Sequence, residues 1–153
     1  MAMWTEARFA TVDFDKADWS LTEKGLFHKG FPAAVACEAE LLLGPYRWNE
    51  DPKQALQVTV SSDALIKWVR DLEAWLEPQM KGEARSAVRS NIFGETFVRA
   101  KIPPETRFYN STGERASKAP GASTKCQFLL APRPYTLIGA VGLSLRVLAI
   151  QPK

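Results

Sequence analysis

The sequence predicts a mainly β protein, a small barrel of five or six strands with one helix between strands. Several stretches alternate apolar and polar residues with a period of two, which is typical of half-buried strands. One stretch, over about 62–77, instead carries apolar residues at helical spacing. The length of 153 residues and the hydrophobic content of 46% suit one domain with a substantial core. We therefore expect residues 1–153 to fold as a single unit.

The last predicted strand, over 139–151, shows the alternation most fully. One face carries only apolar side chains, namely those of Val141, Leu143, Leu145, Val147 and Ala149. The other face begins with Gly142, Ser144 and Arg146, before Leu148 and Ile150 make both faces apolar. An outer face with room and positive charge suits a ligand that lies on the sheet. An ordinary core strand with one arginine is the alternative.

Further strands are predicted along the chain by the same alternation. They cover residues 32–43, 56–61, 97–102, 106–109 and 126–130, with a short lead-in strand over 9–14. The first of these is long enough to bend around a small barrel.

The helix over about 62–77 has a clear beginning and end. Ser61 or Ser62 can accept hydrogen bonds from its first free amides, and Pro78 ends it. Its apolar stripe consists of Leu65, Val69, Leu72 and Leu76. Trp68 and Trp75 lie two turns apart on one flank, so we expect them at the edge of the core.

Three other segments have weaker local signals. A second short helix is expected over about 83–90, where Arg85 and Arg89 would share a face toward phosphates or solvent. Residues 110–124 contain almost nothing that could enter a core, so we expect a flexible loop. Residues 132–135, Pro-Arg-Pro-Tyr, are predicted to form a proline-bounded turn.

Charge is divided unevenly along the chain. Residues 1–80 contain 8 Lys/Arg and 13 Asp/Glu, a balance of −5, and residues 81–153 contain 12 Lys/Arg and 4 Asp/Glu, a balance of +8. A basic half favours a polyanionic partner such as nucleic acid, and pairing between the two halves is the alternative. No apolar run is long enough to cross a bilayer and no leader pattern is present. We expect a cytoplasmic protein without a membrane partner.

The residues that catalysis or metal binding would need are scarce. His28 is the only histidine and, lacking a spaced ligand or catalytic partner, is expected on the surface or in a turn. Cys37 and Cys126 stand apart in predicted strands, so we expect buried thiols. Glu38 and Glu40 share one strand face and cannot be given separate acid and base roles. We predict a binding protein rather than an enzyme, without a cofactor or metal.

Cations and aromatic rings are interleaved over 97–102 and 106–109. Rings stack on bases of any sequence while cations follow phosphates, which suits single-stranded nucleic acid, and packing within the sheet is the alternative. The candidate phosphate contacts are Arg99, Lys101, Arg107, Lys125, Arg133 and Arg146. The candidate stacking residues are Tyr46, Trp48, Phe108, Tyr109 and Tyr135, with Arg47 as a further contact. The group at 46–48 serves equally well as a loop anchor on the core.

The closing strand also carries a family resemblance. Residues 142–151, Gly-Leu-Ser-Leu-Arg-Val-Leu-Ala-Ile-Gln, are similar to the closing strand of bacteriophage single-stranded-DNA-binding proteins, with further support from residues 106–113. The resemblance implies an OB-type barrel that binds single-stranded DNA without sequence preference and protects unwound strands in replication or recombination. It also implies replication or recombination proteins as partners and a host-cytoplasmic location, and a homo-oligomer is possible. Many such proteins end in an acidic tail, which this sequence lacks.

Two other classes of function are compatible with the sequence. The first is a structural or self-assembling protein, such as a virion subunit, whose acidic and basic halves pair between neighbours. The second is a small metal-dependent nuclease using Glu38, Glu40 or Asp51. Single-stranded DNA binding remains the leading prediction.

Overall fold

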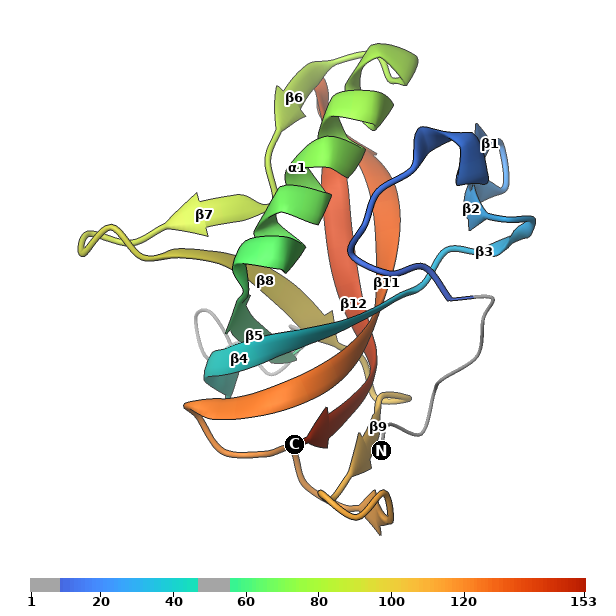
Figure 1. Ribbon diagram of the computed structural model, residues 1–153. Coiled ribbons are helices and arrows are strands. Elements are labelled where there is room, and N and C mark those ends of the chain that lie inside the picture. The colour runs from blue at the N-terminus through green and yellow to red at the C-terminus, as the bar shows by residue number, and fades with distance from the viewer. Residues whose placement is uncertain (1–8, 47–55) are drawn as a thin grey trace.

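A closed barrel forms the centre of the computed structural model, which describes residues 9–46 and 56–153 (Figure 1). Within this part of the chain, the barrel strands are β4 (Val35–Tyr46), β5 (Leu56–Ser61), β8 (Thr96–Ile102), β11 (Thr124–Leu137) and β12 (Ala140–Pro152). Neighbours around the ring are β12, β11, β4, β5 and β8, and β8 pairs with β12 to close it. When these five strands are numbered 1 to 5 along the chain, their order around the ring, starting from β4, is 1-2-3-5-4. The prediction of a mainly β, OB-like barrel is confirmed.

The closing strand β12 follows its predicted pattern up to a bulge. Opposite β11, Leu129 pairs with Ala149 but Leu130 pairs with Val147, so Leu148 is the inserted residue. The insertion reverses which face each later residue takes. Val147 and Ile150 both enter the main core, while Ala149 packs in a second, smaller cluster. The expectation that Ala149 continues the face of Val147 is therefore wrong.

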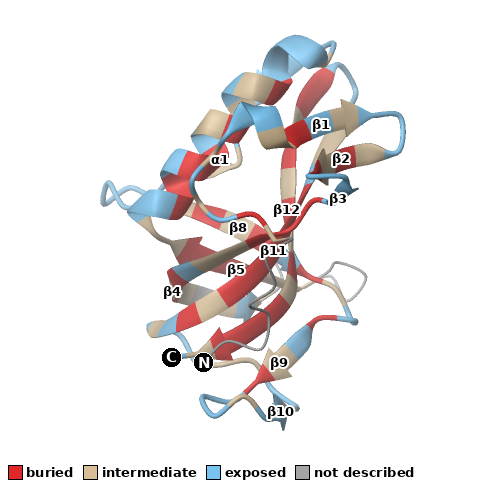
Figure 2. Cartoon of the chain, turned by 45° about the vertical axis from the view of Figure 1, so that its right-hand side comes forward, coloured by how far each residue is buried: buried red, intermediate tan, exposed pale blue. Residues whose placement is uncertain are grey.

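The predicted helix is confirmed as α1 (Asp63–Leu76), followed by a 3-10 turn, η2 (Glu77–Gln79). The hydroxyl oxygen of Ser62 accepts a hydrogen bond from the amide of Leu65 at 3.3 Å, which caps the helix start. The buried stripe packs into the same core as the barrel strands (Figure 2). Trp75 is half-buried at the core edge as expected, whereas Trp68 is completely buried.

The second predicted helix is wrong, because its residues form two edge strands. β6 (Glu83–Arg85) runs parallel to the start of β12, and β7 (Val88–Ser90) pairs antiparallel with β8. The local sequence has helical arginine spacing but no apolar stripe to bury. Backbone hydrogen bonds to distant strands therefore determine its conformation.

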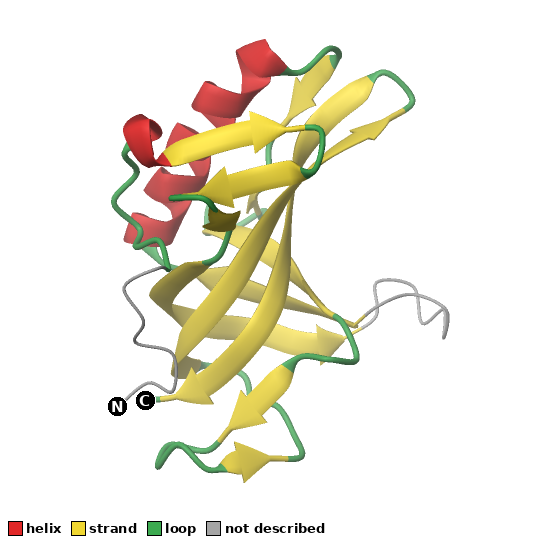
Figure 3. Ribbon diagram, turned by 90° about the vertical axis from the view of Figure 1, so that its right-hand side faces the viewer, coloured by secondary structure: helices red, strands yellow, loops and turns green. Residues whose placement is uncertain are grey.

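The predicted turn at 132–135 is also wrong, because this segment continues β11. β11 pairs with β4 only from Thr124 to Leu130, whereas its pairing with β12 extends to Leu137. Pro132 and Pro134 thus lie beyond the part of β11 that pairs with β4. Proline, which has no amide hydrogen to donate, is tolerated there because that edge of β11 forms no ladder with β4. β11 and β12 consequently continue beyond the barrel as an arm, near whose tip β6 adds to the edge of β12 (Figure 3).

A small sheet packs beside α1 before the barrel begins. It consists of β1 (Trp19–Thr22), β2 (Gly25–His28) and β3 (Phe31–Pro32), preceded by the 3-10 turn η1 (Lys16–Asp18). The strand expected over 9–14 is reduced to one bridge, between Ala10 and Val35. The ring of Trp19 lies 5.8 Å from that of Trp68, which joins the small sheet to the helix.

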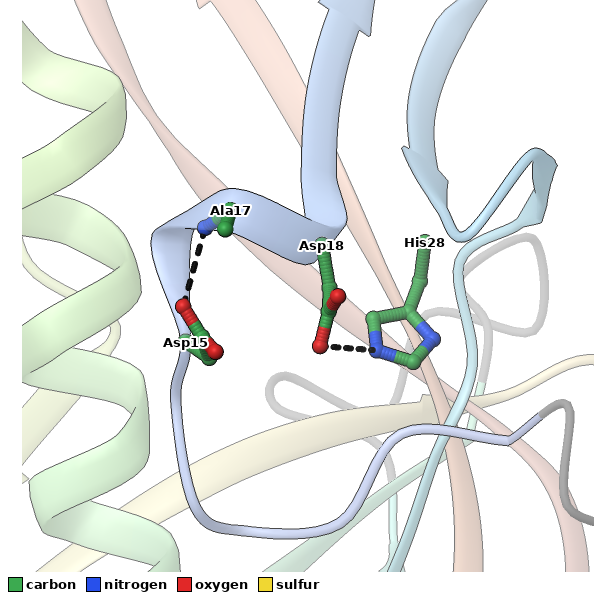
Figure 4. Close-up of polar contacts among 4 residues, drawn as sticks. All are labelled: Asp15, Ala17, Asp18 and His28. Atoms are coloured by element: carbon green, nitrogen blue, oxygen red, sulfur yellow. Dashed lines mark hydrogen bonds and ion pairs between the residues drawn. The ribbon is translucent and has the colours of Figure 1, made fainter.

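His28 is buried inside this small sheet, so its expected surface position is wrong. Its ring lies 5.0 Å from that of Trp19, and its Nε2 atom lies 4.0 Å from Oδ2 of Asp18 (Figure 4). In the same turn, Oδ1 of Asp15 accepts a hydrogen bond from the amide of Ala17 at 3.0 Å. The histidine packs as part of the core rather than as an exposed group.

At the opposite end, β9 (Arg107–Tyr109) pairs parallel with β12 and antiparallel with β10 (Arg115–Ala116). β10 lies within the 110–124 segment, whose flexibility stays a prediction. Oδ1 of Asn110 accepts hydrogen bonds from the amides of Thr112 and Glu114, which shapes the turn between the two strands. In the described part of the chain, no helix is long and apolar enough to span a membrane.

The full burial of Trp68 gives a direct test of this core. Replacing Trp68 with alanine is expected to lower the free energy of unfolding by about 3–5 kcal/mol, because it leaves a large cavity between α1 and the strands. Urea unfolding followed by circular dichroism measures the change. Lys67→Ala, at the exposed neighbouring position, is the control and is expected to leave stability nearly unchanged. Equal effects of the two substitutions would contradict the packing.

Candidate nucleic-acid interface

A groove of about 620 Å³ lies outside the barrel, between the β7–β8 hairpin and the arm of β11 and β12. β8 and β12 pair at only two positions, Leu145 with Ala100 and Arg146 with Lys101. Before that junction, β8 is paired with β7 and β12 is paired with β6, and these two edge strands lead away in different directions (Figure 1). The groove occupies the space between the diverging strands.

The floor of the groove is the outer face of β5 and β8. Val98, Ala100 and Ile102 face the core, so the alternating residues Arg99 and Lys101 face outward. Lys101 pairs with Gln57 of β5 and stands beside Arg146 of β12. The strand that closes the barrel therefore places two cations next to each other on the outside.

The arm of β11 and β12 forms one wall. In its register Arg133 faces Ser144 and Tyr135 faces Gly142, so these side chains share the groove side. A Cβ atom added to Gly142 would lie 2.7 Å from the Tyr135 hydroxyl and 2.8 Å from the Arg85 carbonyl oxygen. Only glycine leaves room for the tyrosine ring to cross the strand and for β6 to approach it.

The inner end of the groove is attached to α1 through one carboxylate. Oε1 of Glu73 accepts a hydrogen bond from the Ser86 hydroxyl, and Oε2 accepts one from the amide of Ala87, both at 2.7 Å. Ser86 and Ala87 connect β6 to β7 and line the groove. The helix thereby holds the point from which the two edge strands diverge.

The lining is strongly cationic. Its charged side chains are Arg89, Arg99, Lys101, Arg133 and Arg146, and no Asp or Glu is among the described lining residues. All five come from the basic half of the sequence. Five cations clustered in a lining whose described residues include no Asp or Glu create a positive potential that attracts an extended anion.

The structure brings together five of the predicted contacts in this groove, namely Arg99, Lys101, Arg133, Tyr135 and Arg146. Arg89 also lines the groove, although the sequence predicts it on a helix face, because the pairing of β7 with β8 sets its position. Tyr46 lies close by, since its hydroxyl is 3.1 Å from Oγ1 of Thr59, which pairs with Arg99. Arg47 and Trp48 lie outside the described residues.

Four predicted contacts lie elsewhere. Arg107, Phe108 and Tyr109 belong to β9, where Tyr109 is buried in the smaller core cluster. The guanidinium carbon of Arg115 lies 5.8 Å from the Tyr109 ring centre. Lys125 pairs in register with Glu40 of β4, at the opposite end of β11 from the arm. These residues are separated from the cationic groove.

The groups considered for catalysis show no catalytic arrangement within the described ranges. No three His, Cys, Asp or Glu side chains there are placed to hold a metal ion. Glu38 is ion-paired with Lys153, and Asp51 is outside the described residues. Loss of hydration raises the pKa of Cys37 to about 12 and that of Cys126 to about 11. Both thiols are therefore protonated at neutral pH and poor nucleophiles.

Solved structures with the same architecture come from bacteriophages. A C-terminally truncated single-stranded DNA-binding protein from bacteriophage Enc34 aligns with a TM-score of 0.60 and 10% identity, over 88% of this chain and 91% of that one. The chain has the fold of bacteriophage single-stranded-DNA-binding proteins. The Enc34 protein in complex with single-stranded DNA aligns with a TM-score of 0.56 and 9% identity, over 97% of this chain and 96% of that one.

A more distant likeness links the chain to a second phage. The single-stranded DNA-binding protein gp2.5 of bacteriophage T7 aligns with a TM-score of 0.50 and 12% identity, over 78% of this chain and 90% of that one. The resemblance predicted from the closing strand is thus confirmed at the level of the fold. No family model matches the sequence, and no curated protein matches it.

The crossing of Tyr135 over Gly142 predicts a sensitive position. Gly142→Ala is expected to lower the free energy of unfolding by about 1–3 kcal/mol, because the new Cβ collides with the Tyr135 hydroxyl and with backbone of β6. Thermal and urea unfolding measure the loss. Gly121→Ala is the matched control, since nothing lies within 4 Å of a Cβ there, and it is expected to have little effect. A Gly142 variant as stable as the control would contradict the predicted collision.

Proposed function

We propose that this protein binds single-stranded DNA in the cationic groove, without turnover and with little sequence preference. The observation that carries the proposal is the gathering of five cations among the described lining residues of one groove on the barrel exterior. A strand of nucleic acid supplies phosphates at the regular spacing that such a row of cations can neutralise. Tyr135, in the same lining, offers a ring on which a base can stack.

The position of the groove on the barrel supports this proposal. OB barrels bind oligonucleotides over their second and third strands, flanked by the loops between strands one and two and between four and five. In this chain those strands are β5 and β8, which supply Gln57, Arg99 and Lys101 to the groove. The arm from β11 and β12 leads to the second of those loops. The structural neighbours from Enc34 and T7 are single-stranded DNA-binding proteins, which agrees with this assignment.

The biological role that follows is protection of unwound strands in replication or recombination. Such a protein holds single strands extended and open to the enzymes that copy or recombine them. For a bacteriophage protein, this work takes place in the host cytoplasm. Replication or recombination proteins would then be the natural partners.

Removing three groove cations tests the proposal. The variant Arg99→Gln/Lys101→Gln/Arg146→Gln is expected to bind oligo-dT much more weakly. The slope of log affinity against log salt should shrink by about 2, since each lost phosphate contact removes about 0.7. Fluorescence anisotropy of a labelled oligonucleotide across a salt series measures both quantities.

The matched control removes three exposed cations that are not part of the groove lining, in Lys16→Gln/Lys24→Gln/Lys67→Gln. It lowers the net charge equally and is expected to keep nearly all of the affinity and the salt slope. Equal weakening by both triple variants would mean that net charge, not the groove, holds the DNA. Failure of the wild type to bind oligo-dT at low salt, together with self-association, would favour the structural-protein alternative.

A further inference from the structure

The tip of the β11–β12 arm is an unusual turn. Leu137 and Ala140 pair across it, leaving Ile138 and Gly139 as a two-residue loop. Both loop residues have positive φ, 45° for Ile138 and 77° for Gly139. Hairpin loops of this kind favour Asn-Gly, Asp-Gly or Gly-Gly, because the left-handed conformation crowds a Cβ atom. A β-branched residue is among the least favourable choices at the first position.

Burial does not offset this unfavourable backbone conformation. The side chain of Ile138 is 97% exposed, and that of Leu137 beside it is 64% exposed. Neither residue therefore contributes much to the hydrophobic core, and an asparagine at 138 would form the turn more easily. The folded chain on its own gives no reason for an isoleucine here.

The groove supplies the reason. Leu137 lines it together with Thr136 and Tyr135, so the apolar tip continues directly from the cationic wall. Phosphates gain nothing from leucine or isoleucine, whereas base faces are apolar and are separated by inserted side chains in other nucleic-acid complexes. Apolar side chains placed beyond a row of cations are thus positioned for bases rather than for backbone.

We propose that Leu137 and Ile138 form a wedge that packs against bases of the bound strand and unstacks them at this end of the groove. The proposal rests on the proposed function, since the groove must hold a single strand. It adds a specific action, which is local separation of neighbouring bases. The strained turn is retained because the exposed isoleucine makes its contacts only in the complex.

The substitution Ile138→Asn separates folding from binding. It creates an Asn-Gly turn, so the unfolding temperature is expected to rise. Affinity for oligo-dT is expected to fall roughly tenfold, the scale of burying one isoleucine against an apolar surface. An oligonucleotide carrying 2-aminopurine, whose fluorescence increases on unstacking, is expected to lose most of its enhancement with the variant. A more stable protein that binds less well cannot be explained by misfolding.

The chain offers a matched control at the tip of the β7–β8 hairpin. Ile92 is 94% exposed and lacks the left-handed backbone of Ile138. Neither of its chain neighbours lines the groove, whereas Leu137, next to Ile138, does. Ile92→Asn is therefore expected to leave the affinity, the 2-aminopurine signal and the unfolding temperature near their wild-type values.

The outcomes separate the wedge from the binding function itself. Wild-type affinity and 2-aminopurine enhancement in Ile138→Asn would overturn the wedge while leaving the groove intact, and would point to a protein contact at the tip. Equal losses in Ile92→Asn would also overturn it. No binding of oligo-dT by the wild type would overturn both the wedge and the proposed function.

Discussion

The pairing of β8 with β12 is the constraint on which the rest of the structure depends. Two residue pairs, Leu145 with Ala100 and Arg146 with Lys101, close the barrel. The same two pairs bring cations from distant parts of the chain to one place. They also set the point from which the edge strands β6 and β7 diverge, and that divergence opens the groove. Barrel closure and the candidate site therefore arise from one contact.

This arrangement carries an electrostatic cost in the free protein. Arg146 and Lys101 stand side by side, with Arg89, Arg99 and Arg133 in the same lining and no carboxylate among the described lining residues. Like charges on neighbouring strands repel one another, and solvent and salt screen them only in part. An anion in the groove would relieve this repulsion and stabilise the folded state. The core formed by α1, Trp68 and the barrel strands provides the stability that offsets the repulsion.

The sequence predicted the elements whose identity is decided locally. Alternation identified the long strands, and the Ser62 cap with the apolar stripe identified α1. Prediction from the sequence failed where pairing with distant strands decides the conformation. At 83–90, pairing with β12 and β8 overrides the helical spacing of the arginines. It failed again at 132–135, where two prolines occupy a free strand edge. The bulge at Leu148 left no local signal either.

The sequence likewise predicted those parts of the candidate site that local alternation decides, and missed those that depend on distant pairing. Interleaved cations and rings over 97–102 correctly marked β8 as a strand with a charged outer face, and alternation placed Arg146 on the outer face of β12. Five of the predicted contacts share the groove, although Arg133 and Tyr135 were expected in a turn rather than in β11. The same pattern at β9 instead buries Tyr109, because alternation alone does not reveal which face of a strand meets the core. Arg89 joins the groove only through the β7–β8 pairing, which the sequence did not reveal.

The most direct test of the central claim compares binding of oligo-dT with binding of duplex DNA of the same length. A salt series on the wild-type protein gives both affinities and their salt dependence. Five groove cations predict tight binding of oligo-dT, a log–log salt slope of about −3.5 and much weaker binding of the duplex. Absence of oligo-dT binding at low salt, or duplex binding of equal strength, would contradict a groove built for single strands.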